Sequence, residues 1–251
     1  MTATLASIQR HPLKSHGREA LEHVILTAGA GMVWDRHWAV AHEAAKLTAG
    51  EWGACANFSR GSKAPNLMAI NARLNETTSE LTLTHPDRPD ITFRPDDTTE
   101  AARFVDWVLP LCPADRALPT RIFTVPGRGM TDTDYPSVSL ISLPSNRALS
   151  AHMGIELSPL RWRGNFWLDG LDAFEERAWV GRKLRLGGAL LWIEEPKERC
   201  LATTANPETG ERDADTLQAL RALHGDQDFG LYAKVLESGP VRIGDRAELL
   251  P

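Results

Sequence analysis

The first third of the chain is built from short apolar runs interrupted by glycine, proline and asparagine, and this spacing limits the folds open to it. Between residues 5 and 83 the runs are LASIQRH, EHVIL, RHWAVAH, NLMAINARL and ELTLTH. Apolar runs of this length, bounded by turn formers, are typical of strands rather than helices. The segment therefore predicts a β-rich fold.

The run RHWAVAH indicates how one of these strands is oriented. A period of two places Trp38 and Val40 on one face, and Ala39 and Ala41 on the other. Arg36 shares the face of Trp38, so it avoids the core only if it lies at the end of the strand. We expect one face of this strand to form core and Arg36 to lie at its end.

Three segments have the periodicity and capping residues of helices. TTEAARFVDWVLP can be capped by Thr99 and is stopped by Pro110, and SNRALSAHMG has Ser145 as a cap. DADTLQALRALHG has an apolar stripe and a cap near Asp213 or Asp215. These helices do not alternate with the strands, which argues against a doubly wound nucleotide-binding fold.

The segment PGRGMTDTDYPSVS, residues 126–139, is rich in turn formers and has no apolar periodicity, so it predicts a long surface loop. It is the best candidate for a domain boundary. The boundary divides the chain into an N-terminal β domain, residues 1–125, and a second domain, residues 126–251, with which the first can share strands. Together with hairpins predicted later in the chain, this gives a β-rich α+β class.

Composition and charge exclude several classes of function. The chain has 251 residues, a formal net charge of −5 and a sequence pI of about 5.9. Its overall field repels nucleic acid and anionic membranes, so we expect neither as a partner. Three cysteines are too few for a disulfide framework, and neither a signal peptide nor a membrane-spanning run is visible, which indicates a cytoplasmic protein. An anionic ligand would need a basic pocket assembled from separated residues.

Three other patterns have simpler structural interpretations. Gly127 and Gly129 could form an anion nest, but Asp132 follows closely and would repel a phosphate. Four acidic residues between 169 and 176 could support acid–base hydrolysis, although a short solvated turn explains them better. Five histidines lie within the first 42 residues without the spacing of metal ligands.

The stretch PKERCLATTANPETG contains the most informative cysteine. Cys200 directly follows Arg199 at the end of an apolar strand. A guanidinium beside a thiol favours the thiolate, which is the form that binds soft metals. The alternative is a cysteine that only packs, which is the usual role of an isolated cysteine and the one we assign to Cys55 and Cys112.

Six segments occur in a characteristic order along the chain: IQRHPLKS, GAGMVWDRHWAV, WRGNFWLDG, FEERAWVGRKLRLG, ERCLATTANPETG and DFGLYAKVLESGPVRIGD. Together they resemble the MOSC family, the molybdenum cofactor sulfurase carboxy-terminal domain, joined to its amino-terminal β-barrel domain. The resemblance covers nearly the whole chain, and the segment around Cys200 is its most specific part. It implies a MOSC β-barrel domain packed against a smaller, β-barrel-like N-terminal domain.

The resemblance also implies a bound molybdenum cofactor, whose pterin dithiolene holds the metal. In similar proteins, such as the amidoxime-reducing component and its bacterial relatives, a cysteine coordinates the molybdenum, and Cys200 matches that position. Lys14 and Ser15 match the site for the pterin's terminal phosphate, which needs cationic and hydroxyl donors. The other implied cofactor contacts are Arg36, Ser142, Arg163, Asn165 and Thr203. Without the family, the two arginines are equally well surface ion-pair partners and the asparagine a turn former.

The activity that the resemblance implies is the two-electron reduction of N-hydroxylated or related N–O compounds. Electrons would come from a separate donor protein, because no cysteine cluster follows Asp245. A carrier that holds the cofactor, or a persulfide on Cys200, is the alternative, and a degenerate member that binds nothing is a third possibility. The chain departs from the family pattern at Gly50, where an arginine is usual, and we expect this to affect substrate preference.

Overall fold

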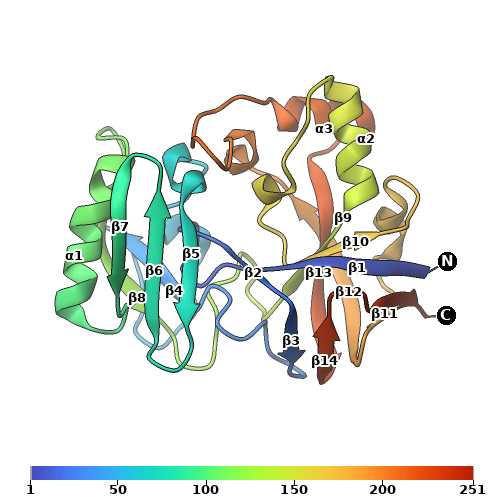
Figure 1. Ribbon diagram of the computed structural model, residues 1–251, viewed down its shortest axis with the longest axis horizontal. Helices are drawn as coiled ribbons and strands as arrows, with labels where there is room; N and C mark the ends of the chain where they lie inside the picture. The colour runs from blue at the N-terminus through green and yellow to red at the C-terminus, as the bar shows by residue number, and fades with distance from the viewer. Residues whose placement is uncertain (1, 251) are drawn as a thin grey trace.

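The computed structural model describes residues 2–250, which form two lobes: a closed barrel and a lobe of smaller sheets (Figure 1). Over this range there are three α-helices, α1 (Thr98–Val108), α2 (Leu143–Met153) and α3 (Thr216–His224). The predicted β-rich α+β class is confirmed. Among the described residues no helix has both the length and the apolar character needed to cross a bilayer.

Seven strands close the barrel. Their order around the ring is β10, β9, β13, β12, β11, β15 and β1, and the pairing of β1 with β10 completes it. Strands β9 and β10 run parallel, and the other neighbours run antiparallel. Strand β2 extends the sheet beyond β1. The strands of this lobe are β1 (Thr2–Arg10), β2 (Glu19–Leu21), β3 (His23–Leu26), β9 (Val138–Ser142), β10 (Phe166–Asp169), β11 (Lys183–Leu186), β12 (Ala189–Glu198), β13 (Asp228–Glu237), β14 (Gly239–Arg242) and β15 (Arg246–Leu249).

Strand β1 comes from the start of the chain but lies among strands of the C-terminal half (Figure 1). Thr4 pairs with Asp169 of β10, and Leu5 and Ile8 are fully buried in the core of the barrel. Strand β3 likewise pairs with β14. Strands from the first 26 residues are therefore part of the sheets that the C-terminal half completes.

The smaller lobe encloses a second core between two sheets and α1. Phe104 of α1 stacks on Phe93 of β7 with 4.8 Å between ring centroids. Asp97 caps α1, because its carboxylate accepts hydrogen bonds from the backbone N–H groups of Thr99 and Glu100 at 2.9 and 3.0 Å. The cap therefore lies two residues before the predicted Thr99. The two sheets are β4 (Trp38–His42) with β8 (Pro119–Thr124), and β5 (Asn71–Asn75), β6 (Glu80–His85) and β7 (Arg88–Phe93).

Strand β4 is buried on both faces, whereas the sequence predicted a core on one face. Trp38 and Val40 lie in the core of the smaller lobe, and Ala39 lies in a separate apolar cluster with Met130. The small alanines on the second face leave room for this second cluster. Arg36 precedes the strand in a left-handed backbone conformation, with φ of 52°, so it lies at the end of the strand as expected.

Helices α2 and α3 pack together beside β9 and β10 (Figure 1). Ser142, the last residue of β9, caps α2 through a hydrogen bond that its hydroxyl accepts from the N–H of Ser145 at 3.2 Å. Gly154 ends the helix with φ of 65°, a conformation that favours glycine. Asp215, one of the two predicted caps, accepts from the N–H of Gln218 at 3.0 Å. The predicted cap Ser145 is instead the donor in the first turn of α2.

The two lobes are joined by a loop that runs from the end of β8 to Val138, within the segment predicted as the boundary. Its Met130 donates a backbone hydrogen bond to the carbonyl of Arg36 at 2.7 Å, which ties the loop to the turn before β4. Short 3-10 helices occupy several other connections. In the described chain these are η1 (Cys55–Asn57), η2 (Pro65–Ala69), η3 (Leu109–Leu111), η4 (Pro159–Trp162), η5 (Glu175–Trp179) and η6 (Leu201–Thr204).

His16 is a fully buried histidine in the turn that leads from β1 into the smaller lobe. Its Nδ1–H donates to the carbonyl of Lys14 at 2.7 Å, and its ring contacts the edge of Phe104. Its Nε2 has no partner among the residues that the structure describes. Burial lowers the pKa of His16 from 6.5 to about 4. The imidazole is therefore neutral in the folded protein at pH 5, where it is protonated in the unfolded chain.

This difference predicts a loss of stability in acid. As the pH falls from about 6.5 to about 4, the unfolded state gains a proton at His16 that the folded state does not, so the free energy of unfolding falls by up to about 3 kcal/mol. The variant His16→Asn keeps a side-chain donor but does not titrate. Between pH 6.5 and pH 4 its free energy of unfolding should therefore fall by about 3 kcal/mol less than that of the wild type. Urea denaturation at pH 7, 5.5 and 4.5 measures the effect. The control is His23→Asn, because His23 is exposed. If the free energy of unfolding falls with pH equally in His16→Asn and in the wild type, the prediction is contradicted.

Candidate functional site

A cleft of about 470 Å³ is lined by residues of both lobes, and it brings together most of the residues predicted from the sequence. Its volume is in the range of small-molecule sites. The walls come from the turn after β1, the turn before β4, the loop that joins the lobes, and the end of β12 with the residues that follow it. Of the predicted site residues, it is lined by Lys14, Ser15, Arg36, Arg163, Cys200 and Thr203.

Cys200 lies just beyond β12, where the chain leaves the barrel, and its side chain is exposed. Thr203 fixes the backbone of this cysteine, because both its N–H and its hydroxyl donate to the Cys200 carbonyl at 3.1 Å. The Thr203 hydroxyl also pairs with that of Thr216, at the start of α3, at 2.7 Å. The thiol therefore projects from a segment anchored to a helix.

Arg199 precedes the cysteine and is held firmly by the barrel. Its Nε donates to the carbonyl of Phe229 at 2.6 Å, and its Nη1 to the carbonyl of Trp162 at 2.8 Å. Its remaining nitrogen, Nη2, is buried without a partner in residues 2–250. Burial lowers the pKa of Arg199 to about 10, so the group still carries its charge at neutral pH.

Lys14 and Ser15 reach the cleft from a tight turn. The backbone N–H of Lys14 donates to the carbonyl of Trp38 at 2.8 Å, and Ser15 has a left-handed backbone with φ of 65°. The Lys14 ammonium donates to the carbonyl of Met130 at 2.7 Å and forms an ion pair with Asp132. Asp132, whose charge was expected to repel a phosphate near Gly129, therefore pairs with Lys14, the lysine predicted to bind the phosphate.

A hydrogen bond links the side chain of Arg36 to the backbone of Arg163. Arg36 forms an ion pair with Asp35, and its Nη2 donates to the carbonyl of Arg163 at 3.0 Å. Arg163 donates through Nη2 to the carbonyl of Gly17 at 3.0 Å, whereas its buried Nη1 has no partner within the described chain. Burial, with Arg36 and Arg18 nearby, lowers the pKa of Arg163 to about 9.

The cleft therefore has more positive than negative charge in its walls. Seven basic residues line it against four acidic ones, although the whole chain is acidic. Burying cations without enough carboxylates is unfavourable unless an anion compensates. The free N–H donors of Arg163 and Arg199 are groups that an anion would satisfy. The arrangement suits a ligand with a phosphate or similar anionic group.

Two predicted contacts lie outside the cleft. Ser142 is completely buried, and its hydroxyl is used to cap α2. The Oδ1 of Asn165 accepts from the N–H and the hydroxyl of Ser139 at 3.0 Å, and its Nδ2 donates to the carbonyl of Gln9 at 3.2 Å. These bonds tie β10 to β9 and β1. In this structure both side chains form hydrogen bonds within the barrel lobe and neither lines the cleft, although Asn165 lines a small cavity of about 10 Å³ that shares residues with the cleft.

Two other sequence features are also remote from the cleft. Gly50 lies in an exposed turn with φ of 79°, and a side chain built there would meet nothing within 4 Å. Within the acidic stretch, Asp169 pairs with Arg147 at 2.7 Å and Glu176 accepts from Ser145 at 2.9 Å. Across residues 2–250, no cluster of three or more histidine, cysteine, aspartate or glutamate side chains could hold a metal ion.

Sequence reasoning missed Lys197, Arg199 and Tyr232 as cleft residues. Lys197 and Arg199 are each 5% exposed and alternate along the end of β12, so both point to the same side. A sequence signal was present, since two cations at alternate positions at the end of an apolar strand are unusual. Burial on that side depends on residues distant in the sequence, such as Arg36 beside Lys197 and Trp162 beside Arg199, which no local pattern reveals.

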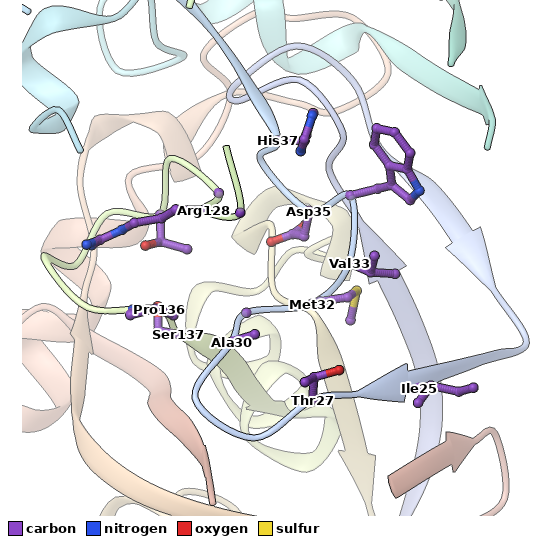
Figure 2. A pocket seen from close by; sticks show the side chains of 15 residues that line it. Ile25, Thr27, Ala30, Met32, Val33, Asp35, His37, Arg128, Pro136 and Ser137 are labelled. Atoms are coloured by element: carbon purple, nitrogen blue, oxygen red, sulfur yellow. The ribbon is translucent and has the colours of Figure 1, made fainter. Parts of the chain in front are cut away.

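A second pocket, of about 370 Å³, lies beside the loop that joins the lobes (Figure 2). We call it the Met32 pocket; its lining includes Ile25, Met32, Val33, Pro136 and Ser137. Asp35 also lines it, and this carboxylate accepts from the N–H of His11 at 2.8 Å and pairs with Arg36 of the cleft. The Asp35–Arg36 pair therefore lies in the wall that separates the pocket from the cleft.

The chain is similar to proteins of two kinds, molybdenum cofactor sulfurases and an amidoxime reducing component. It is 32% identical over 110 residues to the molybdenum cofactor sulfurase of Drosophila mojavensis, which is 43% of this chain and 14% of that protein. It is 29% identical over 124 residues to the human mitochondrial amidoxime reducing component 2, which is 45% of this chain and 36% of that protein. The matched segments thus span a minor part of both relatives.

Among solved structures, the YuaD protein from Bacillus subtilis matches 99% of this chain and 96% of its own, with a TM-score of 0.47 and 13% identity. Two domain families divide this chain between them. Residues 2–111 match the MOSC N-terminal beta barrel domain, and residues 130–248 match the MOSC domain. The chain therefore belongs to the MOSC family, as its sequence motifs predicted.

Proposed function

We propose that this protein binds the molybdenum cofactor in the cleft and reduces N-hydroxylated or related N–O compounds by two electrons, which a separate donor protein supplies. The observation that carries the proposal is an exposed thiol, Cys200, in a cleft whose buried guanidinium groups are incompletely paired. A thiolate ligand and an anion site are what such a cofactor requires. The similarity to the human amidoxime reducing component 2 supports the reductase activity.

The residues of the cleft fit the cofactor's chemistry. The buried Nη1 of Arg163 and Nη2 of Arg199 need acceptors that the described protein does not provide, and phosphate oxygens are strong acceptors. Lys14 and Ser15 add an ammonium and a hydroxyl to the same cleft. Cys200 offers the thiolate ligand. These five residues would hold the group, with the arginines compensating its negative charge.

The chain's contribution to the reaction is to bind, orient and shield the reactants. When bound, the cofactor supplies two-electron redox chemistry. Thr203 holds the backbone of Cys200 in one position, so that the thiol does not reorganise between steps. The cleft has room for a small-molecule substrate, and its basic walls favour groups that carry negative charge.

The surroundings of the protein are also part of the proposal. The formal net charge of −5 supports a chain that binds neither nucleic acid nor an anionic membrane. Three cysteines without a disulfide in the described residues are compatible with the reducing cytoplasm. We therefore place the reaction in the cytoplasm, with the electron donor as the protein partner.

A carrier of cofactor or of sulfur is the second candidate. The similarity to molybdenum cofactor sulfurase favours it, because the same exposed Cys200 thiol could carry a persulfide. A carrier would need the thiol and the anion site but no substrate turnover. The two candidates therefore differ in what is bound to Cys200 when the protein is isolated.

The first prediction concerns the metal. In a host that makes molybdenum cofactor, the wild-type protein should contain close to one molybdenum per chain, and Cys200→Ala should lose most of it because the thiolate ligand is gone. Cys112→Ala is the matched control, since that half-buried thiol lies outside the cleft. Metal and oxidised pterin are measured per protein. Metal absent from wild type, with a labile adduct of one sulfur atom on Cys200, would replace the reductase by the carrier.

The second prediction separates anion-binding residues from structural ones. Arg163→Gln keeps a donor for the Gly17 carbonyl but removes the charge, and should weaken retention of the pterin by about 10-fold to 100-fold. Ser142→Ala should lower the free energy of unfolding by about 1 kcal/mol through the lost helix cap, with unchanged pterin content. Pterin content and urea denaturation are measured for both. Equal pterin loss in the two variants would show that Ser142 contacts the cofactor.

A further inference from the structure

A small polar cavity of about 10 Å³ lies between the Met32 pocket and the cleft. It shares Thr131 and Ser137 with the Met32 pocket, and Ser137 is labelled in Figure 2. With the cleft it shares Arg36, Asp132, Lys197 and Tyr232. Its volume is about that of a single water site, and its lining offers several hydrogen-bonding groups. The small cavity therefore shares wall residues with both larger spaces and has about the volume of one water between them.

Lys197 is the side chain in this lining that lacks a partner. It is 5% exposed, and within residues 2–250 its ammonium forms neither a hydrogen bond nor an ion pair. The ring of Tyr232 lies beside the ammonium, with its centroid 4.7 Å from Nζ. A buried lysine with no carboxylate partner is costly to retain, which indicates a role other than stabilising the fold.

The groups around Lys197 lower the pKa of its side chain. Burial, Arg199 just beyond the same strand, and Arg36 from the turn before β4 lower the pKa of Lys197 well below 10.5. Asp132 and Asp35, from the loops on either side of the wall, oppose this effect without cancelling it. An amine whose pKa is lowered gives up its proton more readily than an ordinary lysine does, whereas a guanidinium keeps its proton.

A pair of hydroxyl groups continues the polar route. The Oγ of Ser137, which lines the Met32 pocket and the small cavity, is 2.8 Å from Oγ1 of Thr133, which lines the cleft. Both residues are buried. Since a hydroxyl both donates and accepts, this pair can pass a proton between the two spaces without large movement.

We propose that Lys197 donates the protons consumed in the cleft, and that it is reprotonated from solvent in the Met32 pocket through a water in the small cavity and the hydroxyls of Ser137 and Thr133. This inference rests on the proposed reductase function. Cleavage of an N–O bond in an N-hydroxyl compound takes up two electrons and two protons, and yields an N–H bond and water. The donor protein supplies the electrons. The Lys197 ammonium gives one proton to the departing oxygen and, once reprotonated, the second to nitrogen.

The decisive comparison is Lys197→Arg. Arginine keeps a cation that can hold an anion but does not release a proton, so this variant should retain cofactor while the turnover rate falls by about 100-fold. Lys197→Met should lose turnover to the same extent. Lys234→Arg is the matched control, because Lys234 also lies over a tyrosine ring, at 4.4 Å, but pairs with Glu194 outside the cleft. It should keep wild-type turnover.

A second measurement does not depend on turnover. Side-chain NMR of protein with isotopically labelled lysine, with the Lys197 signal assigned by its absence in Lys197→Arg, should show that amine titrating well below pH 10.5. Turnover by chemically reduced protein on amidoximes, hydroxylamines and N-oxides is measured beside it. Ser137→Ala should slow turnover several-fold and change its solvent isotope effect, because the relay is interrupted.

The outcomes distinguish this inference from the proposed function. Active wild type with fully active Lys197→Arg, or a Lys197 amine that titrates near pH 10.5, overturns the proton route and leaves the reductase intact. Loss of both cofactor and turnover in Lys197→Arg makes Lys197 a cofactor contact, which also overturns the route. Cofactor-loaded wild type that reduces no N–O compound overturns both the function and the route.

Discussion

The pairing of β1 with β10 is the contact on which the rest of the molecule depends. It closes the ring of seven strands, and it fixes where the chain leaves the barrel, immediately before the turn that carries Lys14 and Ser15. The end of β12, across the same cleft, carries Cys200. A thiol and an ammonium that are nearly 200 positions apart in the sequence thus line one cavity, because one strand is shared between the two halves of the chain.

The charge of the cleft depends on this closure as well. Arg36, Arg163 and Arg199 are each held by backbone carbonyl groups, which are neutral acceptors and leave most of the positive charge uncompensated. Asp35 and Asp132 offset only part of it. An acidic protein therefore maintains a locally basic interior. Burying these cations without full pairing costs free energy, and binding of an anion would offset that cost.

Local patterns in the sequence predicted the strands, the three helices and the joining loop, because periodicity and capping chemistry act over a few residues. The family motifs pointed to Lys14, Arg36 and Cys200, which the fold brings into one cleft. Ser142, which the motifs also named, lies outside the cleft lining, where its hydroxyl caps α2. Lys197 was missed because residues that enclose it, such as Arg36 and Asp132, are distant in the sequence, and no local pattern contains that information.

The shared strand also has a consequence for the order of assembly. Ala3 of β1 pairs with Ala247 of β15, so β1 is synthesised long before this partner strand. The strands of the smaller lobe, β4 to β8, lie between residues 38 and 124 and can pair much earlier. Contacts between such distant residues slow folding, and an unpaired apolar strand invites association with other chains. The edges of β1 that face β15 and β10 therefore stay unpaired until those strands have been synthesised.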